Sequence, residues 1–173
     1  MDSLLGKLKI ALDSAVEGMP EEQLEWHPPE KWCAAEILEH LYLTYTGTVK
    51  GFERVLQAGK PAVGRASIRQ RARMCVVLGL GHMPSGRKAP KNTVPRGLAV
   101  EKVRAEVGLK IAAMDEIITA CEARFGNGKV LDHPILGPLT ASQWRKFHWV
   151  HGRHHAKQIE RLRRQAARAM MSS

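Results

Sequence analysis

Three histidines, His148, His151 and His155, occupy a stripe of a predicted helix where apolar residues are expected. The residues of this stripe alternate four and three positions apart: Trp144, His148, His151, His155, Gln158 and Leu162. This spacing is typical of the face by which a helix packs into a bundle. A buried polar group without a partner is destabilising. The pattern therefore indicates a group inside the protein that binds imidazole, and a metal ion is the simplest such group.

A metal site needs ligands from more than one part of the chain. His151 and His155 are four residues apart, so their side chains leave one helix face about 6 Å apart along the axis. His40, at the edge of the apolar stripe of an earlier predicted helix, is the best candidate for a third ligand. Three histidines leave a coordination position open for water or substrate, as in catalytic sites. Zinc and nickel are the leading candidates for the divalent ion, and iron or another first-row metal is also compatible.

Three further polar residues of the same predicted helix are candidate catalytic groups. His148 lies one turn before His151 and could be a fourth ligand, a base, or a donor that supports a ligand. His154 lies to one side of the ligand pair and could move protons. Gln158, one turn beyond that pair, is suited to hydrogen-bond a ligand or a substrate. For each lone histidine, the alternative is a polar residue that only satisfies its own hydrogen bonds.

The apolar periodicity predicts an all-α fold: a four-helix bundle with short additional helices, in a single domain over residues 1–173. The first four helices are expected at about residues 2–18, 31–57, 67–82 and 100–125. A capping-box pattern over Thr140–Gln143 places the start of the last helix at Thr140. The preceding stretch, Lys129–Leu139, is expected to be non-helical, and no run of β periodicity longer than a few residues appears.

The positive charge of the chain is concentrated in one segment. The net charge is +10 at pH 7, and residues 57–100 contain many Lys and Arg residues but no Asp or Glu. Residues 85–95, rich in Pro, Gly and Lys, predict an exposed basic loop between the third and fourth helices. Such a segment could attract nucleic acid, an acidic partner or an anionic substrate. Nucleic acid is the less favoured partner, because no aromatic residues alternate with the basic ones.

The sequence contains neither an apolar run long enough for a membrane span nor the pattern of a secretory signal, so a cytoplasmic protein without membrane association is expected. Cys33, Cys75 and Cys121 are far apart and lack the close spacing of zinc motifs. They are expected to be small, reduced, apolar residues. Cys33, about two turns before His40, is the best candidate for a reactive thiol.

Three segments of the chain resemble motifs of DinB/YfiT-like proteins. The segment Lys31–Leu41 (KWCAAEILEHL) resembles their W-S-x-x-E-x-x-x-H-L element, with Cys33 where serine is commoner. The segment His151–Ile159 (HGRHHAKQI) resembles their closing H-x-x-H-H-x-x-Q-[IL] element. The segment Asp132–Thr140 (DHPILGPLT) resembles the H-P-x-x-G-x-L-T sequence of one branch.

The resemblance implies a four-helix bundle with a metal near one end, often as a homodimer. Carried over by position, it implies His40, His151 and His155 as the ligands. It also implies either a transferase or isomerase that uses a low-molecular-weight thiol, or a hydrolase.

The leading hypothesis is therefore a metalloenzyme that acts on a small-molecule substrate, as a hydrolase or a thiol-dependent transferase. The first alternative is a non-catalytic module that senses or stores a metal or a small ligand. The second, less favoured, is a protein that associates with nucleic acid through its basic segment.

Overall fold

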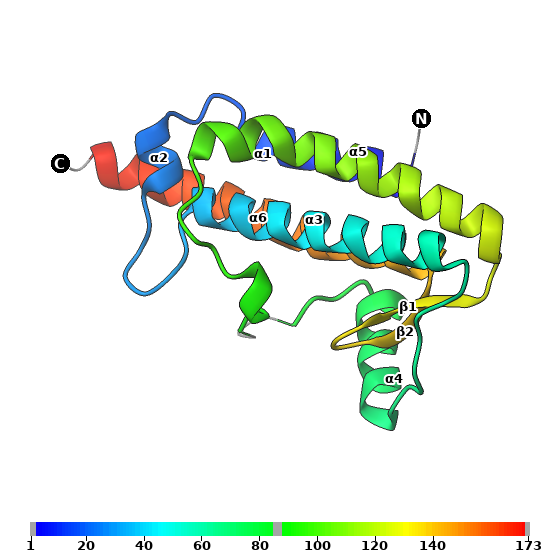
Figure 1. The fold of residues 1–173 in the computed structure, drawn as a ribbon. Helices are drawn as coiled ribbons and strands as arrows, with labels where there is room; N and C mark the ends of the chain where they lie inside the picture. Colours follow the sequence, from blue (N-terminus) through cyan, green and yellow to red (C-terminus); the bar gives the residue numbers. More distant parts are fainter. Residues whose placement is uncertain (1–2, 85–87, 172–173) are drawn as a thin grey trace.

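Four helices lie lengthwise beside one another in the computed structural model, which describes residues 3–84 and 88–171 (Figure 1). They are α1 (Leu4–Val16), α3 (Ala34–Ala58), α5 (Val100–Phe125) and α6 (Ala141–Met171). Helix α3 packs on α5 and α6, and α1 packs on the same two helices. Helices α1 and α6 run in one direction and α3 and α5 in the other (Figure 1). The prediction of a mostly helical fold is confirmed.

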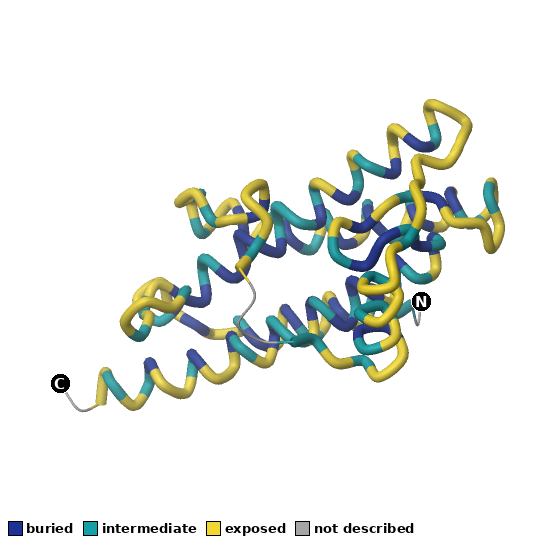
Figure 2. The backbone as a smooth tube through the Cα atoms, turned by 90° about the horizontal axis from the view of Figure 1, so that it is seen from below, coloured by how far each residue is buried: buried dark blue, intermediate teal, exposed yellow. Residues whose placement is uncertain are grey.

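Each of these helices buries one face and exposes the other (Figure 2). In α1 the buried face consists of Leu5, Leu8, Leu12 and Ala15, at the helical spacing of an apolar stripe. At Gly152 of α6 an added Cβ would lie 2.8 Å from the Oη atom of Tyr45 in α3 and would also overlap Leu8. Only glycine therefore allows α6 to approach both α1 and α3 at this point.

The remaining elements are short: α2 (Glu21–Glu25), α4 (Ile68–Met74), a π-helical turn η1 (Cys75–Gly79), a 3-10 turn η2 (Lys91–Thr93) and two strands. Strand β1 (Lys129–His133) pairs with β2 (Gly137–Thr140) in an antiparallel hairpin, with Leu131 opposite Leu139. The sequence correctly indicated a non-helical stretch here but no strand. Strands of five and four residues are too short for their periodicity to be recognised.

Three predicted helix boundaries differ from the structure. The helix expected at 67–82 is a regular α-helix only over α4 and ends with η1 at Gly79, because Gly81 follows with a φ of 63°. Helix α3 begins at Ala34 rather than near Lys31. The first helix starts at Leu4, while residue 2 of its expected range lies outside the described residues. Residues 88–95 of the expected loop are irregular apart from η2, and residues 85–87 lie outside the description.

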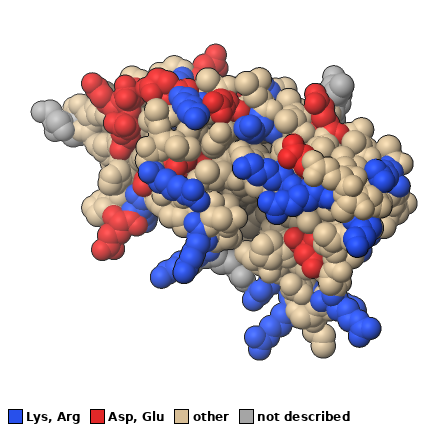
Figure 3. Space-filling view, viewed as in Figure 1, with Lys and Arg blue, Asp and Glu red and all other residues tan. Residues whose placement is uncertain are grey.

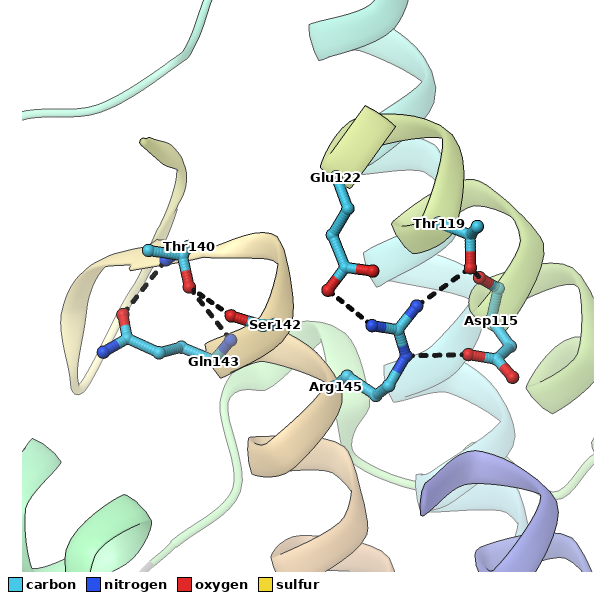
Figure 4. A network of polar contacts seen from close by, with 7 residues as sticks. All are labelled: Asp115, Thr119, Glu122, Thr140, Ser142, Gln143 and Arg145. Carbon is cyan, nitrogen blue, oxygen red and sulfur yellow. Dashed lines mark hydrogen bonds and ion pairs between the residues drawn. The ribbon is translucent and has the colours of Figure 1, made fainter. Parts of the chain in front are cut away.

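Side-chain caps fix the starts of α3 and α6. The amide of Gln143 donates to the Thr140 hydroxyl and the amide of Thr140 donates to the Gln143 side chain, each over 3.1 Å (Figure 4). This is the capping box predicted from the sequence. At α3 the amide of Cys33 donates to Glu36 over 2.8 Å, and the amide of Glu36 donates to the Cys33 sulfur over 3.4 Å. Cys33 thus occupies the position that serine or threonine usually takes.

Arg145 fixes the position of α6 relative to α5. Its guanidinium donates to Asp115 over 2.9 Å, to Glu122 over 2.5 Å and to Thr119 over 2.9 Å, all on α5 (Figure 4). Three directed contacts from one planar group constrain rotation as well as separation. They hold the histidine face of α6 toward the interior. None of the helices in the described ranges is long and apolar enough to cross a membrane.

The Cys33 cap predicts how stability responds to substitution. Cys33→Ala should lower the free energy of unfolding by about 0.5–1 kcal/mol, because it removes the acceptor for the Glu36 amide. Cys33→Ser should preserve or raise it, because a hydroxyl oxygen is a stronger acceptor than sulfur. Denaturant unfolding would measure both changes. Cys121→Ser is the control: this cysteine is fully buried and caps nothing, so serine should destabilise there. Equal losses for Cys33→Ser and Cys33→Ala would contradict a capping role.

Candidate metal centre

Three imidazoles from two helices converge on one point. His40 extends from α3, and His151 and His155 from α6. The Nε2 atom of His151 lies 3.3 Å from Nε2 of His40 and 3.1 Å from Nε2 of His155. The three ligand atoms lie within 4.8 Å of one another. The expectation that these histidines come together across two helices is confirmed.

The outer nitrogens of two of these rings are held by acceptors. Nδ1 of His40 lies 2.8 Å from the backbone carbonyl of Thr93, and Nδ1 of His155 lies 2.7 Å from Oε1 of Gln158. A carbonyl oxygen can only accept, so each Nδ1 carries the proton and each Nε2 presents a lone pair. Both lone pairs point toward His151, which can donate at most one proton from its Nε2. The cluster therefore has more acceptors than donors at its centre.

A divalent cation resolves this excess of lone pairs. Ligand nitrogens at the usual zinc distance in tetrahedral geometry lie about 3.3 Å apart, close to the observed separations. Outer acceptors on ligating histidines are the usual arrangement in metalloproteins. Nδ1 of His151 is buried and has no hydrogen-bond partner among the described residues. The donor set of three imidazoles fits zinc, nickel or a related first-row ion.

Burial keeps the three rings neutral, which is the form that binds metal. Burial, followed by the charge of His40, lowers the pKa of His155 to about 3. Burial also lowers the pKa of His40, against the opposing effect of its bond to Thr93. The pKa of His151 lies well below its usual range because of burial and the neighbouring histidines. At neutral pH none of the rings must lose a proton before it can bind an ion.

A buried carboxylate holds the backbone that orients His40. Glu39 is only 3% exposed, and it accepts hydrogen bonds from the amides of Arg96, Gly97 and Leu98 over 2.7–3.1 Å. These residues lie three to five positions after the end of η2 at Thr93, so Glu39 helps to hold the segment whose Thr93 carbonyl contacts His40. Neither Glu39 nor Thr93 could be identified from the sequence, because Thr93 is 53 residues from His40 and Arg96 is 57 residues from Glu39.

The other predicted site residues lie at different depths. Gln158 contacts the cluster directly, through His155. His154 is partly exposed, and its ring centroid lies 5.3 Å from that of His155. Burial, followed by the charges of Arg161, His82 and Lys157, lowers the pKa of His154.

His148 lies in the core and is fully buried. It is not among the three residues whose ligand atoms cluster. The Thr48 hydroxyl donates to the Thr44 carbonyl over 3.0 Å, so Nε2 of His148, 3.1 Å away, donates to Thr48. Its ring stacks on Trp144 at a centroid separation of 5.6 Å. Burial lowers its pKa to about 3. The structure thus packs His148 into the core, about one turn from His151 but outside the three-histidine cluster.

The surface near this centre is divided by charge. On the face shown in Figure 3, acidic side chains gather over the end that carries α2 and the start of α5, whereas Lys and Arg predominate around α4. A hollow of about 450 Å³ at the acidic end is lined by five glutamates and Cys33 among other residues. Cys33 itself is buried, and burial raises the pKa of its thiol. The structure therefore gives Cys33 a capping role, and burial disfavours the thiolate form of its side chain.

A mostly helical protein with a three-histidine cluster is thus defined by its fold and site. The chain matches the family described as "Protein of unknown function (DUF1569)" over residues 7–162 and belongs to that family. The match includes all three clustered histidines. No curated protein and no solved structure matches the chain.

The Glu39 contacts predict an effect at the metal centre. Glu39→Gln should weaken binding of zinc or nickel about 10- to 100-fold, because it releases the segment that orients His40. Metal titration with a competing chelator would measure the affinity. The matched control is Glu101→Gln, the same change at an exposed position near by. Circular dichroism would establish that both variants fold, and an unchanged metal affinity in folded Glu39→Gln protein would contradict this role.

His133 predicts a pH dependence of stability. Its Nδ1 accepts from the amides of Ile135 and Leu136 over 3.1 Å, and burial lowers its pKa to about 4. The unfolded chain binds this proton near pH 6.5, so His133 stabilises the fold above that pH. This contribution is lost as the pH falls toward about 4.

The free energy of unfolding should therefore rise with pH between about pH 4 and pH 6.5. His133→Asn, which retains an acceptor but cannot titrate, should reduce the slope of this free energy against pH by at most about 1.4 kcal/mol per pH unit. Urea unfolding of metal-free protein between pH 7 and pH 4 would measure it. His27→Asn, the same substitution at an exposed histidine, is the matched control. The same slope for His133→Asn and the unsubstituted protein would show that His133 does not contribute.

Proposed function

We propose that this protein is a DinB/YfiT-like metalloenzyme that binds one divalent ion through His40, His151 and His155. One observation carries the proposal: the outer partners of His40 and His155 leave two Nε2 lone pairs facing the third ring. A structural zinc site is closed by four protein ligands, whereas three ligands leave a position for substrate or water. Zinc and nickel are the favoured ions. The lengthwise packing of α1, α3, α5 and α6 is consistent with the four-helix bundle that this resemblance implies.

We further propose that the reaction is a hydrolysis or the transfer of a low-molecular-weight thiol. A bound divalent ion would supply Lewis acidity, which lowers the pKa of a water or thiol at the open position. Gln158 would orient His155 through the bond to its Nδ1. His154, at the partly exposed edge of the cluster, is the group placed to move protons between the site and solvent. The homodimer implied by the resemblance belongs to the same proposal.

We assign His148 a positioning role in place of a role in proton transfer. It is fully buried, and its Nε2 is occupied by Thr48 of α3. The bond joins α6 to α3 about one turn from His151. It therefore helps to set the register in which the ligands of the two helices meet.

Metal analysis tests the proposal. Protein purified without a histidine tag should carry about one zinc or nickel ion per chain, or take up one on titration. His151→Ala should reduce affinity more than about 100-fold, because it removes a ligand rather than an outer partner. His27→Ala is the matched control, since this histidine is exposed and outside the cluster.

Two results would overturn parts of this assignment. Folded protein that takes up no divalent ion would exclude the metal site. Protein that binds the ion but shows no metal-dependent turnover with thiols or with ester and amide substrates would favour the non-catalytic module. Loss of turnover in His154→Gln with metal content retained would support its part in proton transfer.

A further inference from the structure

We propose that a basic pocket beside the three-histidine cluster binds the anionic group, a carboxylate or phosphate, of a small-molecule substrate. The proposal rests on the proposed function, since it names the substrate class of the same site. The pocket is a hollow of about 290 Å³ between residues 81–83 and α6. This volume accommodates a small molecule or one end of a larger one.

The pocket adjoins the metal ligands through two of its lining residues. Gln158 lines it and accepts from Nδ1 of His155 over 2.7 Å. His154 also lines it, and its ring is in edge-to-face contact with His155. A molecule bound here is therefore separated from a ligand of the cluster by one side chain. A substrate with its anionic group in the pocket can present another part to the metal.

The charge of the pocket is positive and is not neutralised. Arg153, Lys157 and Arg161 line it together with His82, and no lining residue is acidic. Helix α6 contains one acid, Glu160, and it is not among the lining residues. Among the described residues, no carboxylate forms an ion pair with Arg153, Lys157 or Arg161, whereas Arg145 of the same helix pairs with Asp115 and Glu122. The three pocket cations are thus free to pair with an anion from solution.

The geometry of Arg153 also favours a defined binding site. Its guanidinium carbon lies 5.4 Å from the centroid of the Trp149 ring, a cation–π contact that limits its movement. A guanidinium can bind two oxygens of a carboxylate or phosphate at once. Since the contact with Trp149 already restrains Arg153, its side chain loses little conformational freedom when it binds such an anion. Lys157 and Arg161, one turn apart on α6, border the same hollow.

Anion titration of metal-free protein tests the pocket independently of the metal. Inorganic phosphate and succinate, titrated by calorimetry at low ionic strength, should bind. Arg161→Gln and Lys157→Gln should each weaken that binding about tenfold. The matched control is Arg164→Gln on the same helix, which is exposed and does not line the pocket. Arg164→Gln should leave the anion affinity unchanged. Arg161→Lys, which keeps the positive charge, should bind the anion more tightly than Arg161→Gln but less tightly than the unsubstituted protein. The tighter of the two probes identifies the anionic group.

Three outcomes would overturn the proposal. The first is the absence of phosphate and succinate binding to the folded, unsubstituted protein. The second is an equal loss of affinity in Arg161→Gln and Arg164→Gln, which would indicate a general charge effect without a site. The third is binding of duplex DNA that depends on Arg161 when neither small anion binds, which would assign the cations to nucleic acid. If no divalent ion binds, the proposed function fails while these titrations still report on the pocket.

Discussion

The separation of α3 and α6 near His40 decides whether three imidazoles can share one ion. Helical geometry fixes the relative positions of His151 and His155 on α6. His40 can join them only if α3 has a particular axial position and rotation relative to α6. Gly152 permits the close approach, the Arg145 contacts orient α6, and the bond from His148 to Thr48 joins the two helices beside the cluster. The ligand geometry is therefore a property of the helix packing as a whole.

Burial of polar groups in this protein is accompanied by specific partners. Glu39 is buried as a carboxylate, an arrangement that is costly without compensation, and three backbone amides donate to it. His133 accepts from two amides at the hairpin turn. These interactions give irregular segments defined positions against the long helices. The histidine cluster differs from these structural contacts, because the Nε2 lone pairs at its centre outnumber the protons available to them.

The sequence predicted the parts of this arrangement that depend on local spacing. The helical stripes, the Thr140 cap and the pairing of His151 with His155 follow from periodicity and from residues within one or two turns. His40 could be identified because it lies beside an apolar stripe. The Thr93 carbonyl and the Glu39 contacts could not be predicted, because they join distant parts of the chain through backbone atoms that nearly every residue has. The β1–β2 hairpin could not be predicted either, because its short strands depend on packing against the rest of the protein. His148 shares the stripe of the ligands, and only the neighbouring helix shows that its nitrogen is bound to Thr48.

The bond between Thr93 and His40 gives the basic segment a thermodynamic connection to the interior. Residues 57–100 look from composition like a solvated surface, yet their Thr93 carbonyl is the outer partner of a candidate ligand. If the cluster binds the proposed ion, an interaction that favours the arrangement in which Thr93 contacts His40 would therefore strengthen ion binding. By reciprocity, ion binding would stabilise that arrangement of the segment by the same free energy. The conformation of this surface segment and ion binding at His40 would then be thermodynamically coupled.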